Sequence, residues 1–407
     1  MNCRFCNIKV EHLFVSLGSS PLSNSYLTEE QLHKMEPFYP LDVYVCENCF
    51  LVQLDEFESP ENIFSEYAYF SSYSDTWLKH AKDYADKMTE RFGFNTHSFI
   101  IEIASNDGYL LQYFIEKGIP ILGIEPAVNV AETARQKGIP TETVFFGTET
   151  AKRLASEGKY ADLLIGNNVL AHVPNLNDFV AGLKIILKPR GITTMEFPHL
   201  MKLVDEVQFD TIYHEHFSYF SFLTVKKVFN AHGLTLFDVE ELPTHGGSLR
   251  IYACHADDKS KEVSQRITEL EKQEINAGYT DINFYLHFSE KVKSIKRNIM
   301  KFLIQAKENG KTIVGYGAPA KGNTLLNYCG IRNDFLDYTV DRNPHKQGLY
   351  LPGSHIPIES SDRIKKTKPD YVLILPWNIK DEIIEQISYI REWGGKFVIP
   401  IPEVKVL

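Results

Sequence analysis

Short apolar runs that alternate with helical stretches are the feature that most constrains the fold of this chain. A first series comprises SFIIEIAS, ILGIEP, ADLLIGNNVL and GITTMEFP. A second series, in the C-terminal hundred residues, comprises TIVGYG, FLDYTVDRN, DYVLILPWN and KFVIPIPEV. Apolar runs of this length, separated by helical segments, predict parallel sheets covered by helices. Two Rossmann-like α/β domains are therefore expected.

The remaining segments suggest how these domains are connected. At 407 residues the chain is too long for one hydrophobic core. Apolar positions recur at helical spacing from Thr76 to Phe92, and the segment from Asp257 to Asn309 is polar, free of proline and also helical in pattern. The expected divisions are an N-terminal domain, a first α/β domain, a helical connector and a second α/β domain, with limits at 1–75, 76–256, 257–309 and 310–407.

Composition and charge exclude several classes of protein. No run of about 18 apolar residues exists that could span a bilayer. The N-terminus, MNCRFCNIKV, has no apolar core of a signal peptide, so a cytoplasmic protein is expected. The formal net charge of -10 argues against a nucleic-acid partner, although a local basic pocket for a pyrophosphate is compatible with it.

Two C-x-x-C pairs near the N-terminus predict a metal site. Cys3 and Cys6 form the first pair, and Cys46 and Cys49 form the second. Four thiolates complete a tetrahedral zinc shell with no open position, which is a structural site. The 39-residue spacer is longer than usual for a zinc ribbon. The alternatives are cysteines without metal and a redox dithiol.

A strand-turn-helix pattern predicts a nucleotide-binding turn. Glu102, Ala104, Asn106 and Gly108 lie in or beside the turn after the first apolar run, and the next run ends in Glu125 and Pro126. An acid at the end of a second strand is where ribose hydroxyls are held. The pattern fits a dinucleotide or S-adenosylmethionine, but the absence of G-x-G-x-x-G disfavours NAD. An ordinary tight turn is the remaining interpretation.

Several longer motifs resemble one known family. EIASNDGYLL, GIEPAVNVAETA and NNVLAHVPNLNDF, together with EFPHLMKLVDEVQFDTIYHEHFSYFS, HGGSLR, GYGAPAKGN and LPWNIKDEI, resemble the nucleotide-sugar C-methyltransferases of deoxysugar biosynthesis. Ala104 departs from the glycine usual there. The resemblance implies zinc-binding, S-adenosylmethionine-binding and nucleotide-sugar-binding domains in that order. It also implies that Asn167 and Asn168 belong to the cofactor site.

Methylation of a carbon beside a ketone requires a base for the C–H proton and donors that hold the enolate oxygen. The stretch Tyr213-His214-Glu215-His216 is rich in such groups. As a strand it would divide them between two faces, whereas as a loop it would let all of them converge. The resemblance implies His216 as the base, with Tyr213, Glu215, His172 and Tyr67 around the sugar. A surface or core role for His216 and a histidine metal site are the alternatives.

Two further groups of residues are expected to bind the nucleotide sugar. Small residues and a lysine at a helix N-terminus favour a diphosphate. The first group follows strands of the second α/β series and comprises Gly315, Gly317, Ala318, Lys321, Asn323, Asp341, Arg342, Lys346, Trp377 and Asn378. The second lies upstream and comprises His245, Gly246, Gly247, Ser248 and Arg250. Gly-rich turns with a solvated cation are the alternative interpretation.

Together these features predict an S-adenosylmethionine-dependent C-methyltransferase with structural zinc. Its expected substrate is a nucleotide-linked 4-keto-6-deoxy sugar, with thymidine diphosphate as the carrier and C3 favoured over C5. An O- or N-methyltransferase is the second hypothesis, and it needs no C–H base. A zinc-ribbon adaptor without enzymatic activity is the third.

Overall fold

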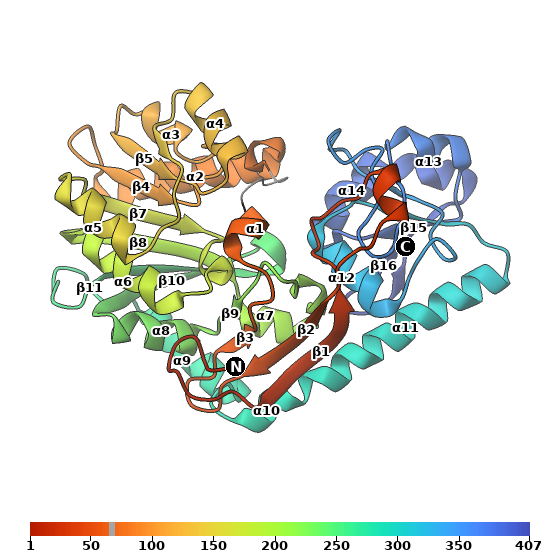
Figure 1. Cartoon of the computed structure of the whole chain (residues 1–407), viewed down its shortest axis with the longest axis horizontal. Coiled ribbons are helices and arrows are strands. Elements are labelled where there is room, and N and C mark those ends of the chain that lie inside the picture. Colours follow the sequence, from red (N-terminus) through yellow and green to blue (C-terminus); the bar gives the residue numbers. More distant parts are fainter. Residues whose placement is uncertain (65–69) are drawn as a thin grey trace. The chain divides into compact units, whose positions relative to one another are not determined.

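The computed structural model of the chain describes residues 1–64 and 70–407 (Figure 1). These residues form two compact units, which are described separately below. Unit 1 consists of Met1–Glu11, Val45–Leu200 and Glu215–Ile282, and unit 2 consists of His12–Tyr44, Met201–His214 and Asn283–Leu407. The segments 1–75 and 76–256 are each divided between the two units, so the domain limits expected from the sequence remain a prediction.

Unit 1 is built on a mixed seven-stranded sheet with the order β10-β11-β8-β7-β4-β5-β6. Strands β4 to β8 run parallel, whereas β11 runs antiparallel to its neighbours β8 and β10. The order changes direction at β4, and this topology places ligands beyond the carboxyl ends of β4 and β7. The strand bounds are β4 Ile100–Ile103, β5 Ile121–Ile124, β6 Thr141–Glu142, β7 Ala161–Asn167, β8 Leu187–Pro198, β10 Leu234–Leu242 and β11 Ser248–His255.

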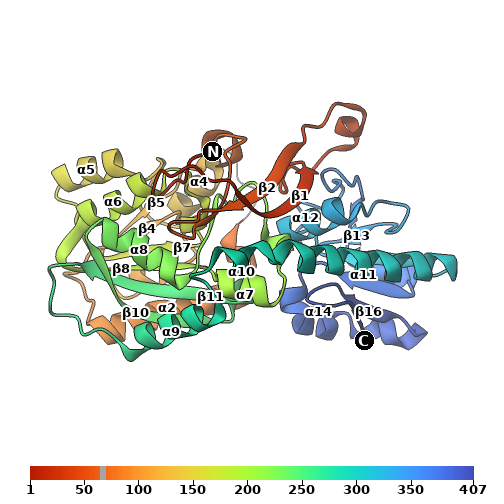
Figure 2. The same ribbon diagram turned by 90° about the horizontal axis from the view of Figure 1, so that it is seen from below.

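Helices cover both faces of this sheet, which is why β4 and β5 are buried along their whole length. Figure 2 shows α5, α6 and α8 on one side and α2 on the other. Ser74 caps α2 by accepting the Trp77 N–H, and Gly93 ends it at a φ of 72°. The helix expected over 76–92 is thereby confirmed. The bounds are α2 Asp75–Phe92, α3 Gln112–Ile115, α4 Val128–Gln136, α5 Thr148–Ser156, α6 Leu176–Ile186 and α8 Phe222–Ala231.

A short antiparallel pair in unit 1 joins the N-terminal segment to the loop before α8. β3 (Val52–Leu54) pairs with β9 (Ser218–Tyr219). The Phe217 N–H donates to the Ala171 carbonyl at 2.8 Å, which ties this loop to η3 (Leu170–His172). Residues 212–217 form a turn and loop, so the loop alternative for the histidine-rich stretch is the observed one. The remaining elements are α1 Pro60–Phe64, η2 Ser71–Tyr73, η5 Thr244–Gly246 and α9 Gln265–Ala277.

Unit 2 is built on a six-stranded sheet with the order β14-β13-β12-β15-β16-β17. All pairs are parallel except β16 with β17. The order reverses between β12 and β15, so the ligand crevice of this sheet lies beyond their carboxyl ends. The bounds are β12 Ile313–Tyr316, β13 Thr339–Val340, β14 Ile358–Glu359, β15 Tyr371–Ile374, β16 Lys396–Ile399, β17 Lys405–Val406, α11 Phe288–Glu308, α12 Ala320–Cys329, α13 Asp362–Thr367, η6 Trp377–Ile379, α14 Lys380–Gln386 and η7 Ser388–Trp393.

An N-terminal segment packs into unit 2. Leu27 and Tyr350 exchange backbone hydrogen bonds of 3.0 and 2.8 Å. Glu36 accepts the Gly353 N–H at 2.8 Å and pairs with His355 at 2.9 Å. Sequence patterning did not predict this association, because the segment has no strong period of its own. Its elements, with the others that contribute to this unit, are β1 His12–Ser20, η1 Glu29–His33, β2 Tyr39–Val45, α7 Leu200–Asp205, η4 Phe209–Thr211 and α10 Ile282–Leu286.

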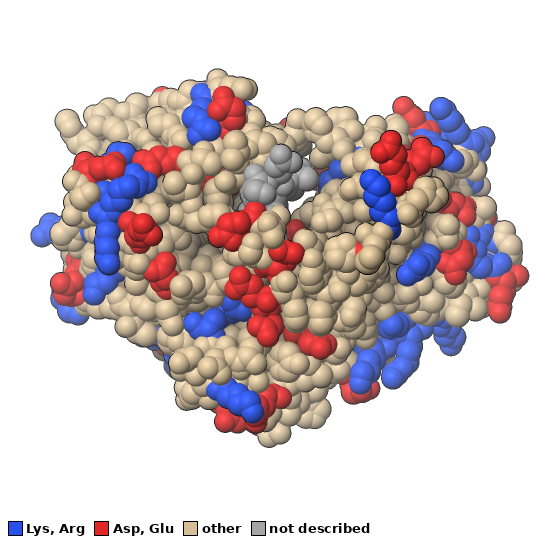
Figure 3. Space-filling model, viewed as in Figure 1, with Lys and Arg blue, Asp and Glu red and all other residues tan. Residues whose placement is uncertain are grey.

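The expected fold class, an N-terminal cysteine cluster with two Rossmann-like sheets, is confirmed. On the face shown in Figure 3, acidic and basic side chains are interspersed rather than gathered by sign. Within residues 1–64 and 70–407, no helix is both long enough and apolar enough to cross a membrane.

Candidate active site

Each cysteine pair in unit 1 closes a turn with the same backbone hydrogen bonds. The N–H of the first cysteine donates to the carbonyl five positions on, at 2.7 Å in one turn and 3.0 Å in the other. Its carbonyl accepts from the N–H four positions on, at 2.9 Å in both. These fourth residues are Asn7 and Phe50, with φ of 59° and 63°. A left-handed φ is unfavourable for a residue as bulky as Phe50, so the second turn holds a strained conformation.

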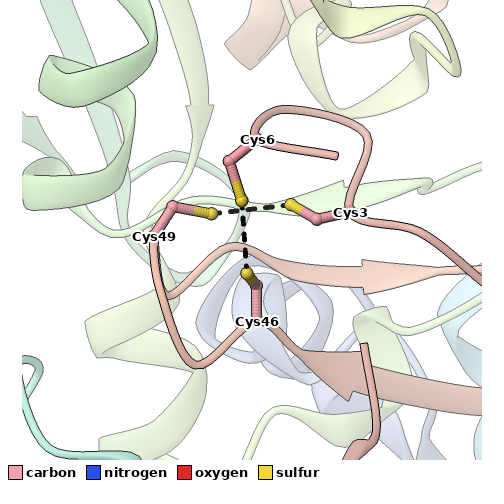
Figure 4. Close-up of side chains that lie close together, drawn as sticks. All are labelled: Cys3, Cys6, Cys46 and Cys49. Atoms are coloured by element: carbon pink, nitrogen blue, oxygen red, sulfur yellow. Dashed lines mark hydrogen bonds between the residues drawn. The ribbon is translucent and has the colours of Figure 1, made fainter. Parts of the chain in front are cut away.

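The four cysteine sulfurs converge on one point (Figure 4). The sulfurs of Cys3 and Cys49 and those of Cys6 and Cys46 are 3.5 Å apart, and all four lie within 4.8 Å of one another. Zinc bonded tetrahedrally at ~2.3 Å separates its sulfur ligands by about 3.8 Å, so the cluster fits zinc. Gln53 Nε2 donates to Cys3 Sγ at 3.3 Å, a contact that stabilises a thiolate ligand. No second group of this kind occurs in the part of the chain that the structure describes, which leaves a histidine metal site without support.

The expected cofactor residues gather at one edge of the unit 1 sheet. The turn from Ala104 to Gly108 follows β4, Glu125 and Pro126 follow β5, and Asn167 and Asn168 lie at the end of β7. Parallel strands end at the same edge, which brings these residues together. β11 runs antiparallel to β8, with Ser248 opposite Pro198. The turn that leads into β11, His245-Gly246-Gly247-Ser248 (the HGGS turn), therefore lies at that edge as well.

The turn after β4 has an unusual backbone. Ala104, Asn106 and Gly108 have φ of 55°, 50° and 77°. At Gly108 a Cβ would also lie 2.1 Å from Ile139 Cδ1, so both backbone and packing require glycine. Ala104 adopts the left-handed conformation although it is not glycine, at a cost of about 1–2 kcal/mol. The departure from the family's glycine therefore adds strain but leaves the turn intact.

Glu125 anchors this turn to the next strand. Its two carboxylate oxygens accept the N–H groups of Asn106 and Ala127, each at 2.9 Å. Burial raises the pKa of Glu125 to about 7, even though both hydrogen bonds favour the ionised form. A carboxylate offers about four acceptor sites, so Glu125 retains capacity for ribose hydroxyls. The predicted role thus fits, with an additional structural role in the turn.

Glu102 carries the clearest sign of an absent ligand. It is fully buried in β4, and neither carboxylate oxygen has a hydrogen-bond partner among the described residues. Burial raises its pKa well above the usual range, against an opposing influence of the Tyr109 hydroxyl. Leaving such a group unsatisfied costs roughly 1–3 kcal/mol, and perturbed buried acids mark ligand sites. Nearby Asp107 pairs with Lys137 at 3.0 Å.

The loop after β7 contacts the HGGS turn. Asn168 Nδ2 donates to His245 Nε2 at 3.1 Å, and the Trp77 ring meets the His245 ring edge-on at 5.1 Å. Asn168 and His245 both have positive φ, as do Gly246 and Gly247.

His216 packs against His172 at this edge. The two rings lie 4.7 Å apart at 86°, and His216 is 7% exposed. Burial, together with the nearby His216 and His245, lowers the pKa of His172 well below its usual value, so His172 is neutral at neutral pH. The hydrogen bond of Phe217 to Ala171 holds the pair together.

The other catalytic candidates lie in the loop before β9 or outside the described residues. The chain passes from unit 2 to unit 1 between His214 and Glu215. Glu215 is buried and Tyr213 is half-buried. His214 Nε2 donates to the Pro40 carbonyl at 3.1 Å, and burial lowers the pKa of its imidazole, as expected for a packed histidine. Tyr67 lies outside the described residues. Catalytic roles for Tyr213, Glu215 and Tyr67 remain predictions.

Arg250 belongs to a buried ionic network. It donates to Glu196 at 2.8 Å and to Glu240 at 3.4 Å. Glu196 also accepts from Thr244 at 2.9 Å and pairs with His80 at 3.0 Å. Burial raises the pKa of Glu196, but His80 and Arg250 outweigh it and hold this pKa at about 2. Through Thr244 the network holds the HGGS turn, and substrate binding by Arg250 itself remains a prediction.

Three predicted residues meet at the crevice of the unit 2 sheet. Lys321, in the first turn of α12, donates to Asn378 Oδ1 at 2.8 Å and lies over the Trp377 ring at 5.1 Å. Burial lowers the pKa of Lys321, and Asp210 opposes that shift. A desolvated cation at this crevice suits an anionic ligand.

The turn after β12 is held through both backbone groups of one residue, Ala318. The Ala318 N–H donates to Asp341 at 2.7 Å, and its carbonyl accepts from Lys346 at 2.8 Å and from the Tyr26 hydroxyl at 2.6 Å. Gly317 is required here because its φ is 90° and a Cβ would lie 2.6 Å from a proline ring. Asp341 and Lys346 therefore shape the turn, and ligand binding by them remains a prediction.

The other predicted unit 2 residues are more varied in environment. Asn323 donates to the Ser23 carbonyl at 2.6 Å and is buried. Arg342 is exposed, with Glu382 at 3.9 Å. A Cβ at Gly315 would lie 2.7 Å from Thr339 Oγ1, so this glycine serves strand packing. Their substrate-binding roles remain predictions.

Sequence reasoning missed three residues that shape these sites: Asp210, Tyr26 and Glu196. Each contacts residues far away in the chain, and none lies in a glycine-rich or cysteine-rich motif. A signal exists only for Glu196, a single acid inside the apolar run GITTMEFP. A charge in a buried strand indicates a partner, but it does not identify which one.

Three family models together cover most of the chain. They are described as "Putative zinc binding domain" (residues 3–64), "Methyltransferase domain" (77–239) and "C-methyltransferase C-terminal domain" (243–402). The first contains the cysteine cluster and the second contains the turn after β4. A methyltransferase identity leaves the adaptor hypothesis without support.

Individual relatives give the same result. The C-methyltransferase NovU of Streptomyces niveus is 35% identical over 405 residues, covering 100% of this chain and 96% of the relative. A ubiquinone biosynthesis O-methyltransferase of Bartonella bacilliformis is 26% identical over 97 residues, covering 23% of this chain and 38% of the relative. The structure of magnesium protoporphyrin IX methyltransferase from Synechocystis aligns with 44% of this chain and 83% of its own chain at 13% identity. Its TM-score of 0.35 is too low for any inference about this protein. With a full-length relative and three consecutive family domains, the chain belongs to the C-methyltransferase family and is an S-adenosylmethionine-dependent enzyme with an N-terminal zinc-binding cluster.

Proposed function

We propose that this enzyme methylates a carbon beside the ketone of a nucleotide-linked 4-keto-6-deoxy sugar, at C3 in preference to C5, with thymidine diphosphate as the carrier. The observation that carries the proposal is the contact of His216 with a neutral His172, beside the cofactor edge of unit 1. Methylation of oxygen or nitrogen needs no base for a C–H proton. The full-length similarity to a C-methyltransferase supports the same reaction type.

In the proposed mechanism His216 removes the proton from the carbon alpha to the ketone. The C–H electron pair moves into an enolate, whose oxygen is held by His172, while Glu215 orients the loop. S-adenosylmethionine, when bound, supplies an electrophilic methyl group. Its S–CH₃ bond would break as the methyl is transferred to the enolate carbon, and the electron pair of that bond would stay on sulfur as neutral S-adenosylhomocysteine. His216 retains the proton until solvent takes it. Tyr67 is expected beside the sugar.

The charges of the two sheet edges support separate binding of cofactor and substrate. Glu102, Asp107 and Glu125 present carboxyl groups at the unit 1 edge, where Asn167 and Asn168 complete the cofactor site. A sulfonium and an amino group are cations, which the ionised form of Glu125 favours, whereas burial raises the pKa of Glu102 well above its usual range. Lys321 and the turn after β12 in unit 2 suit a diphosphate.

The test is incubation with S-adenosylmethionine and a panel of thymidine- and uridine-diphosphate 4-keto-6-deoxy sugars. Mass spectrometry should detect one added CH₂ group, and NMR should place the new methyl on C3. The matched control is the same nucleotide sugar with the ketone reduced, which should not react because its C–H is not acidic. Product methylated on oxygen or nitrogen, or turnover of the reduced control, would reject the proposal.

A further inference from the structure

Asp210 is a buried acid to which neither the sequence motifs nor the proposed mechanism assigns a role. It lies in η4 of unit 2 and is 0% exposed. Its Oδ2 accepts the Trp377 indole N–H at 2.7 Å. Its Oδ1 has no hydrogen-bond partner among the described residues. The backbone N–H groups of Asp210 and Thr211 also favour its ionised form, but a fully buried carboxylate is costly, so its presence requires an explanation.

Neighbouring contacts hold Asp210 against α12, the helix whose first turn contains Lys321. Thr324 of α12 donates to the Ile212 carbonyl at 3.0 Å. The rings of Phe209 and Tyr328 meet edge-on at 5.3 Å. η4 is therefore packed on α12 on both sides of Asp210. This packing fixes the position of the acid relative to Lys321, which lies in the first turn of α12.

Trp377 connects the acid to the lysine. Its indole N–H binds Asp210, and its ring lies beneath Lys321 Nζ at 5.1 Å. A carboxylate that accepts from the indole N–H fixes the plane of the ring, and that plane determines whether its face meets the cation. Removal of the acid therefore affects Lys321 in two ways, through the ring and through charge.

Electrostatics within unit 2 agree with this arrangement. Asp210 is the charged group that acts on Lys321 in the described part of the chain, and it opposes the effect of burial on the lysine. Burial raises the pKa of Asp210 to about 6, so it is ionised at neutral pH. On α12, burial raises the pKa of Cys329 to about 12 and raises that of Tyr328, so both are neutral there.

We propose that Asp210 is a positioning residue of the anion site: it fixes the Trp377 ring beneath Lys321 and supplies the counter-charge that keeps Lys321 a cation for the substrate's diphosphate. The diphosphate part rests on the proposed function above. Asp210 is not a ligand itself, because its buried carboxylate would repel a phosphate.

The first test measures Lys321 without any ligand. Trace acetylation of the full chain across a pH series, read by peptide mass spectrometry, reports the fraction of each lysine that is neutral. In Asp210→Asn, Lys321 should react about tenfold faster near neutral pH, because an opposite charge shifts a pKa by one unit or more. Lys311, which pairs with Asp370 at 2.9 Å, is the internal reference and should not change.

Two further variants separate positioning from folding. Trp377→Phe retains both Asp210 and an aromatic ring but removes the N–H, and should shift Lys321 in the same direction by less. Asp210→Glu should restore part of the wild-type labelling. Unchanged Lys321 labelling in Asp210→Asn, or in Trp377→Phe if the former does not fold, would overturn the proposal even if the melting temperature fell.

The second test uses thymidine diphosphate itself as the probe, by calorimetry at neutral and at alkaline pH. Asp210→Asn should bind it about tenfold more weakly than wild type as pH rises, since Lys321 then loses its charge earlier. If wild type binds no nucleoside diphosphate, the proposed substrate fails and the diphosphate part with it, while the labelling result still decides the effect of Asp210 on Lys321.

Discussion

The two units place their ligand crevices by the same topological rule but equip them with different ionisable groups, acids in unit 1 and a lysine in unit 2. In unit 1 the strand ends carry Glu102, Asp107 and Glu125, of which two are buried without a cationic partner. In unit 2 the corresponding edge carries Lys321, set over a tryptophan ring and balanced by one buried acid. Strand order decides where a ligand lies, whereas the residues at strand ends decide its charge.

The units also differ in how their irregular parts are held. Unit 1 contains a four-cysteine cluster whose two turns share one hydrogen-bond pattern. In unit 2 the N-terminal segment is held by backbone and side-chain contacts such as Leu27 with Tyr350. Metal removal should therefore affect the two units unequally.

The largest expected effect comes from that difference. Cys46→Ser should lose zinc and destabilise unit 1 by several kcal/mol, since structural zinc contributes on the order of 10 kcal/mol to folding. Plasma emission analysis and thermal unfolding measure both effects. The matched control, Cys329→Ser in unit 2, should retain its zinc. Purified wild type with well under one zinc per chain would contradict the assignment.

The next effect tests whether chemistry resides at the unit 1 edge. His216→Asn should lower the methyl-transfer rate by ~10²–10⁴-fold with near-normal cofactor affinity, because it removes a general base. His214→Asn is the control, since His214 binds a carbonyl inside unit 2. Deuterium wash-in at the carbon beside the ketone, with S-adenosylhomocysteine bound, isolates the proton step. Equal wash-in by His216→Asn and wild type would identify another base.

A reciprocal pair of variants tests the charge comparison directly. Lys321→Met should weaken thymidine diphosphate binding by about 1.5–3 kcal/mol, the range for hydrogen bonds to charged groups, and leave S-adenosylmethionine binding unchanged. Glu125→Gln should do the reverse. Calorimetry with each ligand on each variant measures this pattern. If either variant weakens both ligands equally, the two crevices do not have separate roles.

The smallest effect concerns pH. The pKa of Glu125 is raised from 4.5 to about 7, so the folded protein retains a proton that the unfolded chain releases. Between those values stability falls as pH rises, and above about 7 this contribution is constant. In the proposed role the ionised carboxylate accepts from the ribose hydroxyls and favours a cation, so cofactor affinity should instead rise with pH and level off above about 7, as calorimetry can follow. Glu125→Gln should show a flat profile, and a flat wild-type profile would contradict the assignment.

Much of the site was predictable because the signals are local. Glu102 lies inside an apolar run, Glu125 ends the next one, and the cysteine pairs have metal-ligand spacing. Lys321, Trp377 and Asn378 were named from separate strand ends, and sheet order then brought them together. Asp210 and Tyr26 could not be named, because their contacts join segments with no shared pattern.

By itself the sequence determined the two α/β series, the cysteine ligands and the strand-end residues, since apolar periodicity and motif spacing are properties of neighbours in the chain. Only the tertiary structure decided that His172 faces His216, that Glu196 and Arg250 hold the HGGS turn, and that an N-terminal segment packs into unit 2. These contacts follow from strand order and close packing, which bring residues far apart in the chain within a few ångströms of each other. Neither of the two contacting segments carries a sequence pattern that predicts the contact.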